Sequence, residues 1–227
     1  MRLGSLFAGG KDSTLAMHLA IKEGHEVATL ITMASENAES YMFHVPNVEL
    51  THLHAEAMGL PIVFHRTKGI KEIELDDLKS AIREAMRVYH IDGVVSGAIS
   101  SNYQRTRIDR ICGELGITSL VPLWRRVPRE MLSQMVADGY KIIMSAVAAD
   151  GLGPEWLGRE IDGAAIEELT TLHDTCYVCT AGEGGEFETL VLDAPLFKKR
   201  LVILEAEKIW SGQSGVFKVK KAVLADK

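Results

Sequence analysis

The stretch that decides the fold lies near the amino end, where residues 3–13 read Leu-Gly-Ser-Leu-Phe-Ala-Gly-Gly-Lys-Asp-Ser. Residues 3–7 predict a short buried strand, and a helix is expected over residues 13–23. Two adjacent glycines at a strand-to-helix turn leave backbone N–H groups accessible, and the helix adds the positive end of its dipole. Lys11 contributes a charge and Ser13 a hydroxyl. The turn therefore predicts a phosphate-binding loop, and with it a nucleotide-binding enzyme.

Composition limits the classes of protein that remain. A chain of 227 residues with 47% hydrophobic content is long enough for one large or two small domains with a packed core. The net charge of −6 argues against a wide nucleic-acid surface. Three cysteines do not make a disulfide framework and fit a reducing compartment. Because no signal peptide or bilayer-spanning apolar run is recognisable, we expect a cytoplasmic protein without membrane or direct nucleic-acid partners.

Strand and helix patterns alternate through the first half of the chain. Strands are expected at residues 27–33, 62–64, 94–97 and 118–121, and helices at 49–58, 75–89 and 101–115. Such repeats are typical of a parallel, doubly wound sheet with helices on both faces. Farther along, helices are expected at 128–138 and 161–173, and strands at 141–148, 176–180, 188–192, 201–210 and 216–224. We therefore expect an α/β fold, with a mainly parallel Rossmann-like domain over residues 1–125 and a smaller α+β substrate domain over 126–227.

Two common nucleotide fingerprints do not fit the glycine turn. A P-loop needs a glycine five residues before Gly10 and Ser or Thr after Lys11, but the chain has Ser5 and Asp12 at these positions. The dinucleotide pattern G-x-G-x-x-G is also absent. What remains is Gly-Gly-x-Asp-Ser, which resembles the loop of the PP-loop ATP pyrophosphatases. Their usual Ser-Gly-Gly-x-Asp-Ser begins with serine where this chain has Ala8, so one hydroxyl is lost while the backbone donors are kept.

Further segments narrow the resemblance. They are Ser-Tyr-Met at residues 40–42, Ser-Gly-Ala-Ile at 96–99, Tyr103-Gln104 with Arg107, Pro-Leu-Trp at 122–124, Glu-Gly-Gly-Glu-Phe-Glu-Thr at 183–189 and Asp-Ala-Pro-Leu-Phe at 193–197. Together they resemble the diphthine–ammonia ligases over nearly the whole chain. The resemblance implies the last step of diphthamide synthesis on translation elongation factor 2. There ATP adenylates the diphthine carboxylate, ammonia displaces AMP, and pyrophosphate is released.

The chemistry of adenylation and the positions of the strand ends indicate the ATP-binding residues. Residues 8–13 (Ala8, Gly9, Gly10, Lys11, Asp12 and Ser13) are expected to hold the phosphates, with Lys11 counted as catalytic. Mg²⁺ is expected to bridge the phosphates, and Asp12 either helps to hold it or caps the helix. A tight turn with an Asp/Ser helix cap is the alternative to a binding loop. The adenosine is expected at the carboxyl ends of the strands, beside Thr32, Met33, Gly97 and Ala98.

Substrate contacts are expected from two regions. Tyr103, Gln104, Arg105 and Arg107 lie at the start of the helix expected over residues 101–115. Arg105 and Arg107 are either solvated or suit the α-phosphate or the substrate carboxylate, with Arg107 favoured by the family pattern. Glu183, Glu186 and Glu188 are expected to attract ammonium and to accept its proton, or else to form a solvated turn. Because quaternary ammonium groups favour aromatic faces, Tyr41, Tyr103, Trp124 and Phe187 are candidates for the trimethylammonium group of diphthine.

Several readings stay open from the residues alone. Cys176 and Cys179 form one C-x-x-C pair, and we expect buried, unreactive thiols rather than a metal or redox site. His44, His52 and His54 do not make a reliable metal set. The competing functions are a PP-loop enzyme that thiolates tRNA and a non-catalytic ATP-binding switch. A homodimer is compatible with the sequence, which does not determine the oligomeric state.

Overall fold

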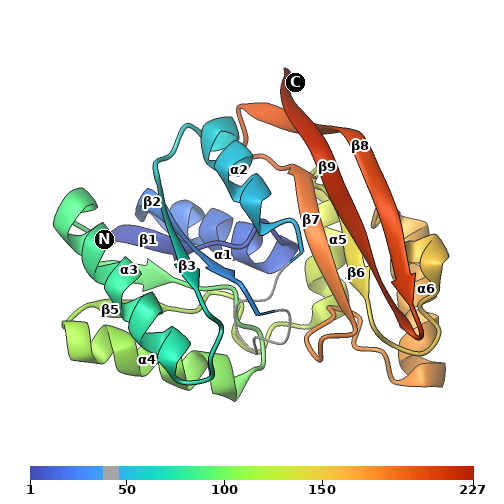
Figure 1. Cartoon of the computed structure of the whole chain (residues 1–227), viewed down its shortest axis with the longest axis horizontal. Helices are drawn as coiled ribbons and strands as arrows, with labels where there is room; N and C mark the ends of the chain where they lie inside the picture. Colours follow the sequence, from blue (N-terminus) through green and yellow to red (C-terminus); the bar gives the residue numbers. More distant parts are fainter. Residues whose placement is uncertain (38–45) are drawn as a thin grey trace. The chain divides into compact units, whose positions relative to one another are not determined.

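The structure, a computed structural model, describes residues 1–37 and 46–227 (Figure 1). Its chain divides into two compact units, Met1–Trp124 and Arg125–Lys227, and each is described by itself. Tyr41, one of the expected substrate-binding residues, lies outside the described residues.

Unit 1 is built on a parallel five-stranded sheet. Its strands are β1 (Arg2–Leu6), β2 (Glu26–Ser35), β3 (Ile62–Thr67), β4 (Gly93–Val95) and β5 (Thr118–Leu120). They stand in the order β3-β2-β1-β4-β5, and every neighbouring pair is parallel. This order confirms the expected doubly wound fold.

Helices cover both faces of this sheet. They are α1 (Lys11–Lys22), α2 (Thr51–Met58, after a short 3₁₀ turn at Val48–Leu50), α3 (Ile73–Tyr89) and α4 (Asn102–Leu115). The chain moves outward from β1 to β3 and then returns past β1 to β4. Because right-handed crossovers are the rule, α1 and α2 lie on one face and α3 and α4 on the other (Figure 1).

An apolar cluster fills the space between the sheet and the pair α3 and α4. Leu78 and Ile82 of α3 have no exposed surface, and they pack in one cluster with Ile31 of β2, Val94 of β4 and Ile111 of α4. Burying one such side chain stabilises the fold by roughly 1.5–3 kcal/mol. The four-residue spacing of Leu78 and Ile82 is the helical period, which is why the sequence predicts this helix well.

Unit 2 combines helices with an antiparallel sheet. Its elements are α5 (Pro128–Ala137), β6 (Lys141–Val147), a 3₁₀ turn (Pro154–Trp156), α6 (Gly163–Cys176), β7 (Phe187–Asp193), β8 (Lys199–Ser211) and β9 (Ser214–Asp226). The strand order is β7-β6-β9-β8, with β8 and β9 forming a long hairpin. The expected smaller α+β unit is confirmed.

Two of the sequence predictions need correction. The strand expected at residues 176–180 does not exist, because α6 runs on to Cys176 and ends at Tyr177, which takes a left-handed conformation. β2 and β3 are longer than expected, since Ala34 pairs with Arg66 and Ser35 with Thr67. Pairing between neighbouring strands extends both of them beyond their most apolar residues.

The described residues contain neither a membrane-spanning helix nor a cluster of metal-binding side chains. None of the helices there combines the length and the apolar composition needed to cross a bilayer. No group of three or more His, Cys, Asp or Glu side chains in residues 1–37 and 46–227 is arranged to hold a metal ion.

Candidate functional site

The expected nucleotide-binding segments follow the two strands at the switch point of the sheet. β1 lies between β2 and β4, and the crossovers that leave β1 and β4 run in opposite directions. Open α/β sheets bind their ligands at this point, beyond the carboxyl ends of the strands. Residues 7–10 follow β1 and residues 96–101 follow β4, so the glycines of both motifs lie at this edge.

Gly9 has a backbone conformation that other residues rarely adopt. Its φ is +79°, and a Cβ built there would lie 3.0 Å from Cε1 of His54. Gly10 is the N-cap of α1, and no side chain caps the helix. The Ser13 hydroxyl donates to the carbonyl oxygen of Gly10 at 3.1 Å. The alternative of an Asp/Ser helix cap is therefore wrong, and the loop presents backbone N–H groups at the positive end of the helix dipole.

Lys11 places a positive charge beside these donors. Its side chain is only 4% exposed, and Nζ lies 2.9 Å from Oδ2 of Asp12. A buried ammonium group needs an anionic partner, and Asp12 supplies one within the chain. The loop fits a polyphosphate, because it combines backbone donors, a helix amino end and this ammonium group. A Mg²⁺ ion there would take one carboxylate and the phosphate oxygens rather than a cage of protein ligands.

Gly97 explains why the loop after β4 also needs glycine. A Cβ on Gly97 would lie 2.7 Å from the carbonyl carbon of Asp12 and 2.8 Å from the amide nitrogen of Ser13. The loop after β4 therefore lies against the backbone of the first turn of α1. Ala98 is 6% exposed and follows in the same packed loop.

The sequence predicts that Thr32 and Met33 end their strand. In the structure they lie three and two residues before its last residue, Ser35. Thr32 is fully buried, and its hydroxyl donates to the carbonyl oxygen of Phe7 at 2.7 Å. The side chain of Met33 belongs to the apolar cluster under α3. Because β1 ends at Leu6, opposite Ile31, the backbone of Met33 extends beyond the end of β1.

Arg107 is paired with a residue that the sequence did not single out. Its Nη2 lies 2.5 Å from Oε1 of Glu72, and its Cζ lies 3.4 Å from the centre of the Tyr103 ring. The hydrogen bond from Arg107 lowers the pKa of the Glu72 carboxyl below its ordinary value, and the same bond raises the pKa of Arg107. Glu72 lies at the amino end of α3, far from Arg107 in the sequence, and no local motif marks it.

The neighbouring candidates of α4 have other contacts. The backbone N–H of Gln104 donates to the Ser101 hydroxyl, which caps the helix at 3.3 Å. The guanidinium carbon of Arg105 lies 4.3 Å from the ring centre of Trp124, and its Nε lies 3.4 Å from Oδ2 of Asp109. A cation therefore already lies against the rings of both Tyr103 and Trp124.

In unit 2, the acidic glycine turn is organised by Glu186. Oε1 of Glu186 accepts a hydrogen bond from the amide of Cys179 at 3.0 Å, and Oε2 accepts one from the amide of Gly184 at 2.7 Å. A Cβ on Gly184 would lie 2.7 Å from Oε1, so this glycine leaves room for the carboxylate. A turn that is only solvated does not describe this segment, because both carboxylate oxygens of Glu186 accept hydrogen bonds from the backbone.

The other members of this segment lie around that anchor. Phe187 is 2% exposed, so its ring is part of the core of unit 2. Glu188 lies on β7 opposite Ala146 and is half-buried, as is Glu183 before the two glycines. Glu183 and Glu188 thus lie on either side of Glu186 in the sequence, and the Glu186 carboxylate accepts the backbone hydrogen bonds.

The cysteines differ in exposure. Cys176 is exposed and Cys179 is half-buried, so the expectation that both are buried is wrong. Cys176 ends a helix instead of lying in a strand, which accounts for its exposure. Cys112 is buried, and this burial raises the pKa of its thiol to about 11.

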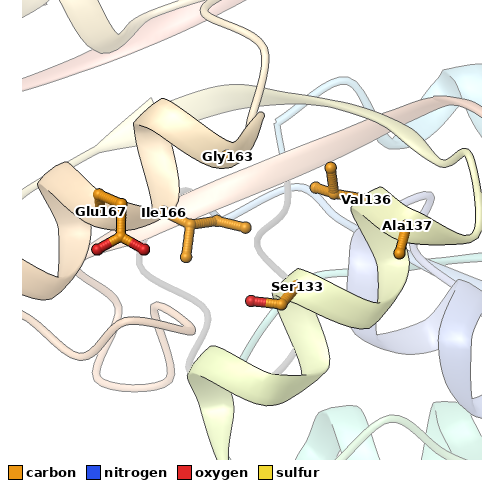
Figure 2. Close-up of a pocket in the computed structure, with 6 residues that line it drawn as sticks. All are labelled: Ser133, Val136, Ala137, Gly163, Ile166 and Glu167. Carbon is orange, nitrogen blue, oxygen red and sulfur yellow. The ribbon is translucent and has the colours of Figure 1, made fainter.

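A shallow pocket of about 220 Å³ opens between α5 and α6 of unit 2 (Figure 2). It is lined by Ser133, Val136, Ala137, Gly163, Ile166 and Glu167. None of the expected site residues contributes to it, and its one charged side chain, Glu167, is paired with Arg129 at 2.6 Å. We therefore do not assign it to the reaction.

Comparison with known proteins assigns the family. Residues 1–119 match the model of the diphthamide synthase N-terminal domain, and residues 128–225 match that of the diphthamide synthase C-terminal domain. The chain belongs to the diphthamide synthase family. The expected resemblance is thereby confirmed, and the protein is a ligase that forms C–N bonds.

Relatives in the diphthamide synthase family agree with this assignment. The chain is 36% identical to the diphthine–ammonia ligase of Danio rerio, over 92% of this chain and 89% of that one. It is 32% identical to that of Homo sapiens, over 92% and 85%. It is 34% identical to that of Schizosaccharomyces pombe, over 98% of this chain but only 40% of that one.

A solved structure described as a predicted subunit of tRNA methyltransferase from Methanocaldococcus jannaschii also matches. It is 16% identical, with a TM-score of 0.44, over 86% of this chain and 98% of that one. At this level of similarity no functional conclusion follows from it.

Proposed function

We propose that this member of the diphthamide synthase family amidates diphthine on translation elongation factor 2 with ammonia, at the expense of ATP. A carboxylate reacts poorly with ammonia, because its negative charge makes it a weak electrophile. Attack of a carboxylate oxygen on the α-phosphorus of ATP forms an acyl-adenylate and releases pyrophosphate. Ammonia then attacks the carbonyl carbon, and AMP leaves with that oxygen. A proton from the attacking ammonia must pass to a base.

The phosphate loop after β1 carries this proposal. The N–H groups around Gly9 and Gly10, the ammonium group of Lys11 and the hydroxyl of Ser13 would bind the phosphates and stabilise the charge on leaving pyrophosphate. Mg²⁺, when bound, would neutralise phosphate charge, and Asp12, which also pairs with Lys11, is the carboxylate proposed to hold it. The positive φ of Gly9 and the close approach of Gly97 to Asp12 support this role, because both keep side chains away from the loop.

The adenosine is proposed to lie along the same edge of the sheet. The backbone of Met33 beyond the end of β1 would contact the base, with Thr32 holding the strand through its bond to Phe7. Gly97 and Ala98 would contact the ribose, since their loop follows β4 at the switch point.

For the protein-borne substrate, we propose Arg107 as the anion-binding group. A guanidinium binds a two-oxygen anion with two parallel hydrogen bonds, which suits either the substrate carboxylate or the α-phosphate. Tyr103, Trp124 and Gln104 complete this region. Since a guanidinium already lies against each of the two rings, a quaternary ammonium group would have to share or displace it.

The acidic turn of unit 2 is proposed to handle the cationic reactants. Glu183 and Glu188 are the candidates for attracting ammonium and accepting its proton, and Glu186 shapes the turn that presents them. Phe187 supports the turn from the core, which its low exposure favours over a direct substrate contact.

The test is a reconstituted reaction. The purified chain is incubated with diphthine-bearing elongation factor 2, MgATP and ammonium, and the modified peptide is followed by mass spectrometry while nucleotides are separated by chromatography. The proposal requires amidation with one AMP per amide. A matched reaction with Lys11→Met should release little AMP. Nucleotide binding without any AMP would instead favour the ATP-binding switch.

A further inference from the structure

The ion pair between Glu72 and Arg107 joins the amino ends of α3 and α4. Glu72 is the N-cap residue of α3, which follows β3, and Arg107 lies in the second turn of α4, which follows β4. Both helices begin beyond the carboxyl ends of parallel strands, so the pair lies at the edge of the sheet where ligands bind. α3 and α4 cover the same face of the sheet (Figure 1).

Glu72 leaves part of Arg107 available. A guanidinium group has five N–H bonds. Nε and Nη2 both donate to Oε1 of Glu72, at 3.2 and 2.5 Å, and Nη1 donates to the carbonyl oxygen of Tyr103 at 3.4 Å. These three bonds leave one further N–H on each terminal nitrogen, beside the Tyr103 side chain. Two such donors on one planar group match an anion with two oxygens.

The Tyr103 ring fixes the plane of that group. Side chains on a helix lean towards its amino end, so Arg107 reaches back over the residue four positions earlier. Its Cζ lies 3.4 Å from the centre of the Tyr103 ring, and Nζ of Lys71 lies 5.8 Å from the same centre. The ring and the carboxylate together restrict the guanidinium in position and in plane, and Lys71 adds positive charge nearby.

The backbone of Glu72 is strained. Its φ of 67° and ψ of −36° lie outside the regions that residues with a side chain favour. A glycine would adopt this conformation without strain. Strained residues of this kind gather at functional sites, where the conformation serves the site rather than stability. An exposed ion pair adds little to stability by itself, so stability alone does not explain a glutamate at this position.

We infer that Glu72 is a positioning residue that holds Arg107 flat on Tyr103, with its two terminal N–H groups presented to a two-oxygen anion of the reactants. The inference rests on the proposed function, in which that anion is either the carboxylate of diphthine or the α-phosphate of ATP. Glu72 itself does not touch the reacting atoms.

The experiment compares variants of the full chain in the amidation reaction. Glu72→Gln keeps the shape but removes the charge, and it should lower kcat/KM about tenfold, as expected for the loss of a charged hydrogen bond that orients a binding group. Glu72→Asp keeps the charge and should recover part of the loss. Glu114→Gln is the matched control, because Glu114 of α4 also forms an ion pair, with Lys79 of α3. It should behave as the wild type.

A fourth variant separates positioning from folding. Glu72→Gly removes the carboxylate and also relieves the backbone strain, so its midpoint of thermal unfolding should equal or exceed that of the wild type while kcat/KM falls. In the Arg107→Ala background, Glu72→Gln should have no further effect, because a residue that acts through Arg107 has nothing left to position.

The anion is identified by comparing the KM for the protein substrate with the affinity for an ATP analogue. A rise in KM for the protein substrate, with unchanged affinity for a non-hydrolysable ATP analogue, identifies the carboxylate, and weaker analogue binding identifies the α-phosphate. Either result supports the inference. Full activity of Glu72→Gln, or losses that simply multiply in the double variant, would overturn it while leaving the proposed function intact. A wild-type chain that forms no amide would refute both.

Discussion

A Cβ placed on Gly97 would lie 2.7 Å from the carbonyl carbon of Asp12, so the loop after β4 touches the backbone of the phosphate loop's helix. The two segments come from different strands and are separated by most of unit 1 in the sequence. Their contact means that neither loop can move at this point without displacing the other. A change at Gly97 should therefore affect nucleotide binding even though it lies outside the glycine motif.

Gly97→Ala tests this contact. The added methyl group meets backbone atoms that cannot rotate away, so we expect a loss of stability of about 1–3 kcal/mol and weaker ATP binding. Calorimetric titration with a non-hydrolysable ATP analogue and thermal unfolding measure the two effects. Gly113→Ala is the control, because Gly113 lies inside α4 with open space around it. That change should stabilise the fold by roughly 0.5–1 kcal/mol. Unchanged ATP affinity in Gly97→Ala would refute the role of the contact.

Glu186→Gln tests the anchor of the acidic turn. A glutamine can accept through only one of its two terminal atoms, so the backbone N–H of Cys179 or of Gly184 loses its acceptor. We expect hydrogen exchange at that amide to become about tenfold faster, together with a loss of amidation. Glu183→Gln should reduce amidation while exchange at the two amides stays slow. Equal exchange in Glu186→Gln and the wild type would show that the turn does not need this carboxylate.

The pKa of Glu72 reports directly on its pair with Arg107. In the folded protein the pKa of Glu72 lies below its ordinary value of 4.5. The stabilisation from the ion pair is therefore complete above pH 4.5 and disappears as the pH falls through the lowered pKa. The pair therefore stays intact at neutral pH. In Arg107→Ala the pKa of Glu72 should rise, while Lys71 and Arg110 still act on it. Carboxyl titration followed by carbon NMR measures this, and an unchanged pKa would mean that Arg107 is not its main partner.

Replacing both cysteines of the C-x-x-C pair separates the ligase from a tRNA-thiolating enzyme. Cys176 is exposed and Cys179 contacts the turn through its backbone amide rather than its thiol. The double change Cys176→Ser and Cys179→Ser should thus keep most of the amidation activity. A complete loss of activity in a variant that still folds would mean that the thiols take part in the chemistry.

Local patterns predicted most of unit 1. The glycine turn and the apolar periods of residues 75–89 and 101–115 lie within single elements, so periodicity and turn chemistry locate them. The sequence predicts the end of β2 too early, because Ala34 and Ser35 are held by pairing with β3, which a single segment does not reveal. The sequence also predicts the wrong end for α6, because no glycine or proline marks Tyr177 as the residue that stops the helix.

In the candidate site, too, residues within a local motif can be predicted from the sequence, whereas contacts between distant elements cannot. The residues of the phosphate loop carry their own signal, but Glu72 does not, because its partner Arg107 is 35 positions away and their meeting depends on how α3 and α4 pack. The sequence likewise cannot predict the role of Glu186, because a carboxylate that accepts backbone hydrogen bonds and one that faces a substrate look the same in a sequence. Contacts between distant elements thus decide what each charged residue does.

The most direct measurement uses diphthine labelled with ¹⁸O in its carboxylate. Adenylation transfers one carboxylate oxygen to the α-phosphorus, so the account predicts AMP that carries one ¹⁸O atom and pyrophosphate that carries none. The label is read by mass spectrometry of the nucleotides after the reaction with ATP and ammonium. AMP without the label, or ADP together with labelled phosphate, would contradict the acyl-adenylate and with it the central claim.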